Sequence, residues 1–329
     1  MKETKIEWTD HSWSPWRGCT KVSPGCANCY AETLSKRNPA VLGQWGRGKP
    51  RVMAKNWNDP VRWNRNVLGD LDIVPGRPDR FTPYHRPTVF PSLCDWLDDE
   101  VPVEWLARFL QLIHDTPNLT WLLLTKRPEN WEQRLRDVCV YFQGLPGDWT
   151  QAPAWQFANR WCPHNGVHRF APPSNVWVGV SVEDQIRADE RIPLLLRIPA
   201  VGRFLSVEPL LGPVELPLAG NTTGFPKHIR RDGSGVGMPQ RINWVIIGGE
   251  SGPGARPCNV EWIRSLVRQC TDASVSCFVK QVGGNVEQDW GGAPIHPPMF
   301  SVKLKHPKGG DPAEWTADLR VREFPEGLR

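Results

Sequence analysis

The sequence predicts an α/β protein built on a partial or complete parallel (β/α) barrel. Short, almost continuous apolar runs recur along the chain, as is typical of parallel strands buried on both faces. Helical patterns lie between these runs, and such alternation predicts βαβ units. No G-x-G-x-x-G motif follows the first strand, so a dinucleotide-binding open sheet is the less favoured architecture.

The strand predictions come from six apolar, β-rich runs that end in polar or glycine residues. These runs span residues 88–90, 119–124, 176–180, 203–207, 244–247 and 277–279. We expect a further strand near Arg17, Gly18 and Cys19. About seven strands approach the eight of a full barrel and are enough for an incomplete one.

Two segments between the strands have clear helical periodicity. Residues 103–113 place apolar side chains at helical spacing and follow Pro102, a residue favoured in the first turn. Residues 261–270 carry Trp262, Ile263, Leu266 and Val267 on one stripe. Both segments are therefore predicted helices that pack against the sheet.

We expect residues 1–329 to form one barrel-sized domain. Residues 143–173 and 220–240 are rich in proline, glycine and polar residues, and we interpret both as irregular surface insertions. The polar segment 309–329 is expected to pack around the barrel as an irregular tail.

The composition is that of an ordinary globular protein, with 40% hydrophobic and 23% charged residues. No apolar run approaches the length of a membrane span, and the first residues do not resemble a signal peptide. We therefore predict a cytoplasmic protein with no membrane partner. Nine cysteines, an odd number, favour reduced thiols, some of them metal ligands. The net charge of +5 permits an acidic partner without requiring one.

Polar residues follow the predicted strands, at the edge where a (β/α) barrel builds its active site. We favour the interpretation that these side chains converge on one polar ligand. The alternative is that polar residues are simply common at solvent-exposed strand ends. The candidates are Ser92, Asp95, Lys126, Ser181, Glu183, Glu208, Gly248, Gly249, Glu250 and Lys280.

The strongest motif is the spacing C-x6-C-x2-C formed by Cys19, Cys26 and Cys29. Thiolates are soft ligands that select zinc, copper(I) or iron–sulfur clusters. Three cysteines would leave one iron of a four-iron cube open to a substrate or cofactor, which is a reason to use three. The alternatives are zinc completed by His11 or Cys94, and thiols that bind no metal.

A second group, Cys162 with His164 and His168, looks loosely like a zinc site. It has no fourth ligand nearby, so we favour ordinary surface polar groups. The other cysteines and histidines are isolated, and no P-loop, H-E-x-x-H or G-x-S-x-G motif is present.

Several motifs in the same order resemble a known family, the phage and prophage proteins with a three-cysteine motif. The resemblance rests on the opening residues 6–16 and the cysteine loop, together with residues 124–128, 177–183, 204–210, 246–252 and 318–325. That family in turn resembles the radical S-adenosylmethionine enzymes. The resemblance implies a radical-SAM-like barrel in which Cys19, Cys26 and Cys29 hold a [4Fe–4S] cluster and S-adenosylmethionine binds the open iron.

The resemblance also implies roles for the strand-end residues. Ser92 or Asp95 would lie near the cofactor amine; Lys126, Ser181 and Glu183 near its carboxylate or ribose; Gly248 and Gly249 near adenine; and Glu208, Glu250 and Lys280 would face the substrate as catalytic residues. The chain departs from the commonest superfamily pattern in its first cysteine spacing, in Asn28, where an aromatic residue is usual, and in residues 92–95, which replace a Gly-Gly-Glu.

An electron donor of the flavodoxin or ferredoxin type is an implied partner. A nucleic acid or nucleotide, or a protein encoded nearby, is a further expected substrate or partner. The alternative function is a non-enzymatic nucleic-acid-binding protein stabilised by zinc or an iron–sulfur cluster. In that case tryptophans would stack on bases and the basic segment 227–231 would contact phosphate.

Overall fold

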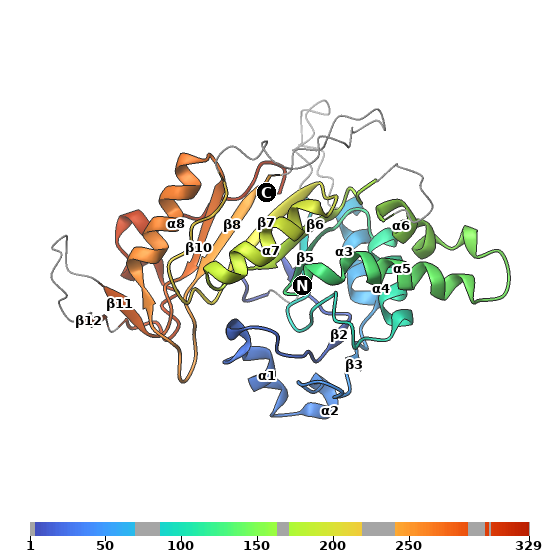
Figure 1. The fold of residues 1–329 in the computed structure, drawn as a ribbon, viewed down its shortest axis with the longest axis horizontal. Helices are drawn as coiled ribbons and strands as arrows, with labels where there is room; N and C mark the ends of the chain where they lie inside the picture. Colours follow the sequence, from blue (N-terminus) through green and yellow to red (C-terminus); the bar gives the residue numbers. More distant parts are fainter. Residues whose placement is uncertain are drawn as a thin grey trace.

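The computed structural model describes residues 4–69, 86–162, 171–218, 241–288, 300–302 and 304–328. Seven strands form one sheet, curled into half a barrel, in which every neighbouring pair is parallel and the strands follow chain order (Figure 1). These strands are β1 (His11–Ser12), β4 (Thr88–Phe90), β5 (Thr120–Thr125), β6 (Val176–Ser181), β7 (Gly202–Val207), β8 (Trp244–Gly248) and β10 (Ser276–Gln281). The predicted α/β class and parallel barrel-like sheet are confirmed in this partial form.

Helices pack on the outer face of the half-barrel. They are α3 (Asn58–Gly69), α4 (Val103–Asp115), α5 (Trp131–Gln143), α6 (Pro153–Trp161), α7 (Gln185–Arg197) and α8 (Val260–Asp272). The two helices predicted from periodicity correspond to α4 and α8. Helix α4 buries Leu106, Phe109, Leu110 and Ile113, three or four residues apart, so that one stripe faces the sheet.

Alternation along the strands divides the core into two parts, because successive side chains of a strand point to opposite faces. Leu123, Leu205 and Val245 face the helices, whereas their neighbours Leu122 and Phe204 point to the inner face. We call the buried inner group the apolar floor of the half-barrel. It consists of Trp8, Phe90, Leu122, Phe204, Trp244, Ile246, Phe278 and Leu328.

The carboxyl-terminal tail helps to cover the inner side of the sheet. It contains the short 3-10 turns η4 (Pro312–Glu314) and η5 (Ala317–Leu319), and Val279 N donates to Val321 O at 2.8 Å. Because Leu328 lies in the floor with Trp8, residues from both ends of the chain close the same side of the sheet.

The first strand of the sheet lies elsewhere than predicted. The chain enters the sheet at β1, whereas β2 (Trp16–Arg17) pairs antiparallel with β3 (Val52–Met53) in a separate ribbon. Cys19 forms only an isolated bridge to Trp45. Strand β1 has two residues and no apolar run, so hydrophobic patterning could not indicate it. A mixed three-stranded sheet of β9 (Cys258–Asn259), β11 (Val286–Gln288) and β12 (Phe300–Val302) was also not predicted.

The two predicted insertions have different outcomes. The described part of 143–173 is more regular than expected. It contains η3 (Trp149–Gln151) and α6, whose Ala154, Ala158 and Trp161 are buried. Trp161 stacks on Trp96 with ring centroids 5.6 Å apart, so aromatic burial holds this helix to the body. The second insertion, 220–240, lies entirely outside the described residues.

Residues 17–55 form a small projection below the sheet, which we call the lobe; it carries helices α1 and α2, drawn in blue in Figure 1. It contains η1 (Pro24–Cys26), α1 (Tyr30–Ser35) and α2 (Pro39–Leu42), with β2 and β3 at its base. In the part of the chain that the structure describes, no helix has the length and apolarity needed to cross a membrane.

Candidate functional site

Toward the carboxyl ends of the strands the inner face changes from apolar to polar. Glu208, Gly248 and Lys280 lie at even spacings from the floor residues Phe204, Ile246 and Phe278. Ser181 lies four residues after Trp177, which packs against the floor, so all four share the inner face. Lys280 Nζ donates to Glu208 Oε1 at 2.8 Å. A Cβ atom added at Gly248 would lie 2.5 Å from the same oxygen. The structure thus brings three of the predicted residues into one cluster.

A second charged cluster surrounds Glu183. This residue lies two positions after the end of β6 and is fully buried. Its carboxylate accepts a hydrogen bond from Arg191 Nη1 at 2.8 Å and lies 3.9 Å from Lys126 Nζ. Burial alone would raise the pKa of Glu183, but the charges of Lys126 and Arg191, together with hydrogen bonds from Ser23 and Gly25, hold the pKa below its ordinary value. Glu183 is therefore a carboxylate at neutral pH. Gly25 N also donates to Glu183 Oε1 at 3.3 Å, which connects this cluster to the cysteine segment.

Glu250, after β8, forms a third cluster. Arg256 Nη2 donates to Glu250 Oε1 at 2.6 Å, and Asn28 Nδ2 donates to Glu250 Oε2 at 2.9 Å. Burial raises the pKa of Glu250, and the hydrogen bonds from Arg256 and Asn28 more than reverse this effect. Arg256 Nη1 also donates to Pro24 O at 3.0 Å, so Glu250 and Arg256 both contact the cysteine segment.

Asp95 and Arg127 form the fourth cluster, beside Cys19. The Asp95 carboxylate accepts hydrogen bonds from Thr125 Oγ1 at 2.7 Å, Lys126 N at 2.9 Å and Arg127 Nη1 at 3.0 Å. The same guanidinium donates to Cys19 Sγ at 3.5 Å. Arg127, which sequence reasoning did not select, thus joins the end of β5 to the first cysteine.

The segment 19–29, here called the cysteine loop, is consequently attached to the strand ends by Arg127, Glu183, Glu250 and Arg256. Tyr30, directly after it, donates its hydroxyl to Ser92 O at 2.6 Å, and the Ser92 hydroxyl lies 2.7 Å from that of Ser12. The ends of β4, β5, β6 and β8 therefore meet at the cysteine loop and Tyr30, whereas Glu208 and Lys280 contact each other.

Cys19, Cys26 and Cys29 are half-buried free thiols. Burial raises the pKa of Cys19 to about 12, although Arg127 opposes this shift, and burial also raises the pKa of Cys29. These two thiols are therefore protonated at neutral pH.

Within the described residues, no three His, Cys, Asp or Glu side chains form a group that could hold a metal ion. This holds for the three cysteines alone and for their combination with His11 or Cys94, and the His11 ring stacks on Trp63 with centroids 4.1 Å apart. A four-iron cube is larger than one ion and takes each thiolate on a different iron. The donor chemistry of three soft thiols on one loop fits such a cluster, but the loop is not a preformed single-ion site.

The other candidates from the sequence do not extend this site. His164 and His168 lie outside the described residues, as does the basic segment 227–231, while Cys162 is buried in the core, where burial raises its thiol pKa to about 12. Nine tryptophans are buried and no described tryptophan is exposed. Core packing therefore accounts for these nine, and the other described tryptophans are half-buried.

The fold and this site define a protein with a parallel α/β half-barrel and a cysteine loop across the carboxyl ends of its strands. The chain belongs to the family described as a protein of unknown function (DUF5131), which matches residues 3–316. No curated protein and no solved structure matches the chain.

Proposed function

We propose that the chain is a radical S-adenosylmethionine enzyme in which Cys19, Cys26 and Cys29 hold a [4Fe–4S] cluster. The observation that carries this proposal is the attachment of the cysteine loop to four charged groups at the strand ends, above a polar inner surface. When bound, such a cluster supplies the electron that cleaves S-adenosylmethionine to methionine and a 5′-deoxyadenosyl radical.

The hydrogen-bond partners of the strand-end residues divide them by role in this proposal. Asp95 and Glu250 each accept several hydrogen bonds from the protein, so they hold the arginines that position the cysteine loop. Lys126 keeps donor capacity, since its ammonium lies 3.9 Å from Glu183, and it is our candidate for binding the cofactor carboxylate. Ser92 is the candidate for the cofactor amine.

Glu208 and Lys280 are the candidates for contact with the substrate. The side chains of Glu208 and Lys280 are 15% and 28% exposed, whereas that of Glu183 is 0% exposed. A ligand inside the half-barrel can therefore reach Glu208 and Lys280. Gly248 leaves room for the Glu208 carboxylate. A different contact requires glycine at position 249, because a Cβ atom there would lie 2.3 Å from Val282 O. A pair that can exchange its mutual hydrogen bond for a polar ligand fits a substrate with both donor and acceptor groups.

The test is anaerobic reconstitution with iron and sulfide, followed by metal analysis and electron paramagnetic resonance. We expect about four irons and four sulfides per chain, and a changed spectrum of the reduced cluster when S-adenosylmethionine is added. Cys19→Ala, Cys26→Ala and Cys29→Ala should each lose the cluster. Cys139→Ala, which removes a buried thiol of α5, is the matched control and should retain it. Stoichiometric zinc without iron, or equal iron in all four variants, would contradict the proposal.

A further inference from the structure

Positive charge is concentrated in the lobe. Residues 17–55 contain eight Lys and Arg residues and a single acidic residue, Glu32, for a net charge of +7. The rest of the chain contains 32 Lys and Arg against 35 less one, or 34, acidic residues, for a net charge of −2. The overall charge of +5 therefore arises from the lobe, which also carries the three cysteines.

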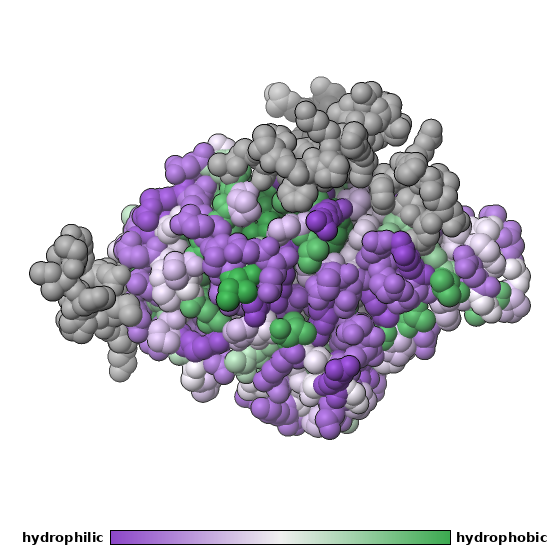
Figure 2. Space-filling model, in the orientation of Figure 1, coloured by the Kyte–Doolittle hydropathy of each residue, from purple (hydrophilic) through white to green (hydrophobic). Residues whose placement is uncertain are grey.

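Most of this charge faces solvent. Lys36, Arg37, Arg47, Lys49 and Lys55 are exposed, and the salt bridges found among the described residues do not include them. Lys21 pairs with Glu32 at 2.7 Å, and the buried Arg51 pairs with Asp98 at 2.9 Å. The lower part of the molecule, where the lobe lies, is mostly hydrophilic in Figure 2.

Apolar side chains lie among these charges. Val22, Leu34 and Val41 are 43%, 38% and 43% exposed. Tyr30 is exposed as well, and its hydroxyl donates to Ser92 O of the body. A surface that combines basic groups with exposed aliphatic groups is suited to a protein partner, because aliphatic groups gain from burial against a protein but not against phosphates.

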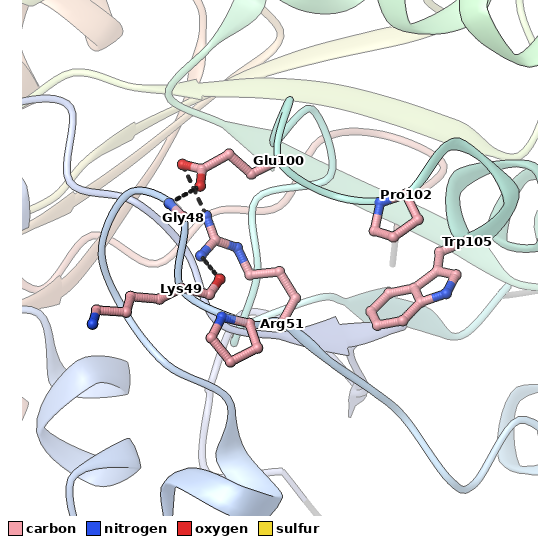
Figure 3. A pocket seen from close by; sticks show the side chains of 7 residues that line it. Gly48, Lys49, Arg51, Glu100, Pro102 and Trp105 are labelled. Atoms are coloured by element: carbon pink, nitrogen blue, oxygen red, sulfur yellow. Dashed lines mark hydrogen bonds and ion pairs between the residues drawn. The ribbon is translucent and has the colours of Figure 1, made fainter.

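The lobe is fixed to the body, as a docking surface requires. A hollow of about 380 Å³ marks the junction, with Gly48, Lys49 and Arg51 on the lobe side and Glu100 and Trp105 on the body side (Figure 3). Glu100 accepts hydrogen bonds from Gly48 N and lies 3.3 Å from Arg51 Nη2. In Figure 3 the Lys49 ammonium points away from Glu100, which leaves its charge available at the surface.

We infer that the lobe is the docking surface for an acidic protein. Charge complementarity selects an acidic partner, and the aliphatic groups favour a protein over a nucleic acid. If the cysteine loop holds a cluster, as the proposed function requires, the partner that fits this position is an acidic electron-transfer protein that delivers the electron. The location of the surface does not depend on that assignment.

Binding of a flavodoxin, used as an acidic redox probe, tests the inference. The lobe variant carries Lys36→Glu, Arg37→Glu, Arg47→Glu and Lys49→Glu. The control carries Arg65→Glu, Arg197→Glu, Lys305→Glu and Lys308→Glu, which make the same change of net charge at exposed positions outside the lobe. At low ionic strength the lobe variant should bind flavodoxin about 10- to 100-fold more weakly, and the control should change far less.

Each other outcome has a defined meaning. Equal weakening in both variants, or unchanged binding in the lobe variant, overturns the inference. Tighter binding of a single-stranded DNA 20-mer than of flavodoxin, lost in the lobe variant, also overturns it in favour of a nucleic acid. The lobe variant should still cleave S-adenosylmethionine with dithionite, which needs no docking. Failure of cleavage in the unaltered protein, with flavodoxin binding intact, would contradict the proposed function and not the docking surface.

Discussion

Two ion pairs at the strand ends have similar lengths but different surroundings. Arg127 and Asp95 lie 3.0 Å apart with side chains 4% and 7% exposed, whereas Lys280 and Glu208 lie 2.8 Å apart with side chains 28% and 15% exposed. The first pair is sealed and touches Cys19; the second opens toward the interior. In our proposal the sealed pair helps to hold the cysteine loop, whereas the more exposed pair binds the substrate.

The largest effect should come from the sealed pair. Arg127→Ala leaves the Asp95 carboxylate buried without its cation, and we expect a loss of about 3–5 kcal/mol in the free energy of unfolding. Urea denaturation of the metal-free protein measures this loss. A loss below about 1 kcal/mol would place this pair among weak surface pairs and remove the contrast with Lys280.

Glu183 should show a smaller effect that depends on pH. Glu183→Gln keeps the size of the side chain but leaves Arg191 with a neutral partner, and should cost about 1–3 kcal/mol at pH 7. Because the folded-state pKa of Glu183 is lowered, its stabilisation is present above the unfolded-state pKa and disappears as the pH falls through the folded-state value.

The unfolding free energies of the unaltered protein and of Glu183→Gln should therefore converge as the pH falls below about 4. Denaturation curves at a series of pH values measure this. A difference that stays constant from neutral to acidic pH would show that the charge of Glu183 does not stabilise the fold.

Gly248→Ala tests how the more exposed pair, Glu208 and Lys280, is packed against β8. The added methyl group would collide with the Glu208 carboxylate, which is the end of a flexible side chain and can move. We expect a cost of about 1 kcal/mol in stability, with the Glu208–Lys280 contact displaced. Thermal denaturation measures the stability. A crystal structure of the variant with this contact unchanged would contradict the expected displacement.

Lys280→Ala should have the smallest effect on stability, about 0–1 kcal/mol, because both partners remain partly hydrated. In our proposal it nevertheless impairs turnover of the natural substrate, while cluster content and cleavage of S-adenosylmethionine alone stay unchanged. A loss of stability as large as that of Arg127→Ala would mean that the two pairs do not differ in role.

The sequence predicted most of the sheet, because strands such as β5 and β8 are continuous apolar runs. It also singled out strand-end residues that the structure brings into contact, such as Glu208 with Lys280. Strand β1 was missed because His11 and Ser12 carry no hydrophobic pattern.

The contacts that hold the cysteine loop were not predictable from local patterns. Arg127 bonds Cys19 from 108 positions away, and Arg256 bonds Pro24 from 232 positions away. The basic lobe was missed for a different reason: the net charge of the whole chain averages a positive segment with a slightly negative remainder. A count of charge along short windows would have revealed it.

The central claim is tested most directly by the product of reductive cleavage. The reconstituted protein is incubated anaerobically with dithionite and S-adenosylmethionine, and 5′-deoxyadenosine is quantified by mass spectrometry. We predict that it forms with the unaltered protein and with Cys139→Ala, and that it is absent with Cys26→Ala. Formation of no 5′-deoxyadenosine by an iron-loaded protein, or the same amount by Cys26→Ala, would contradict the account.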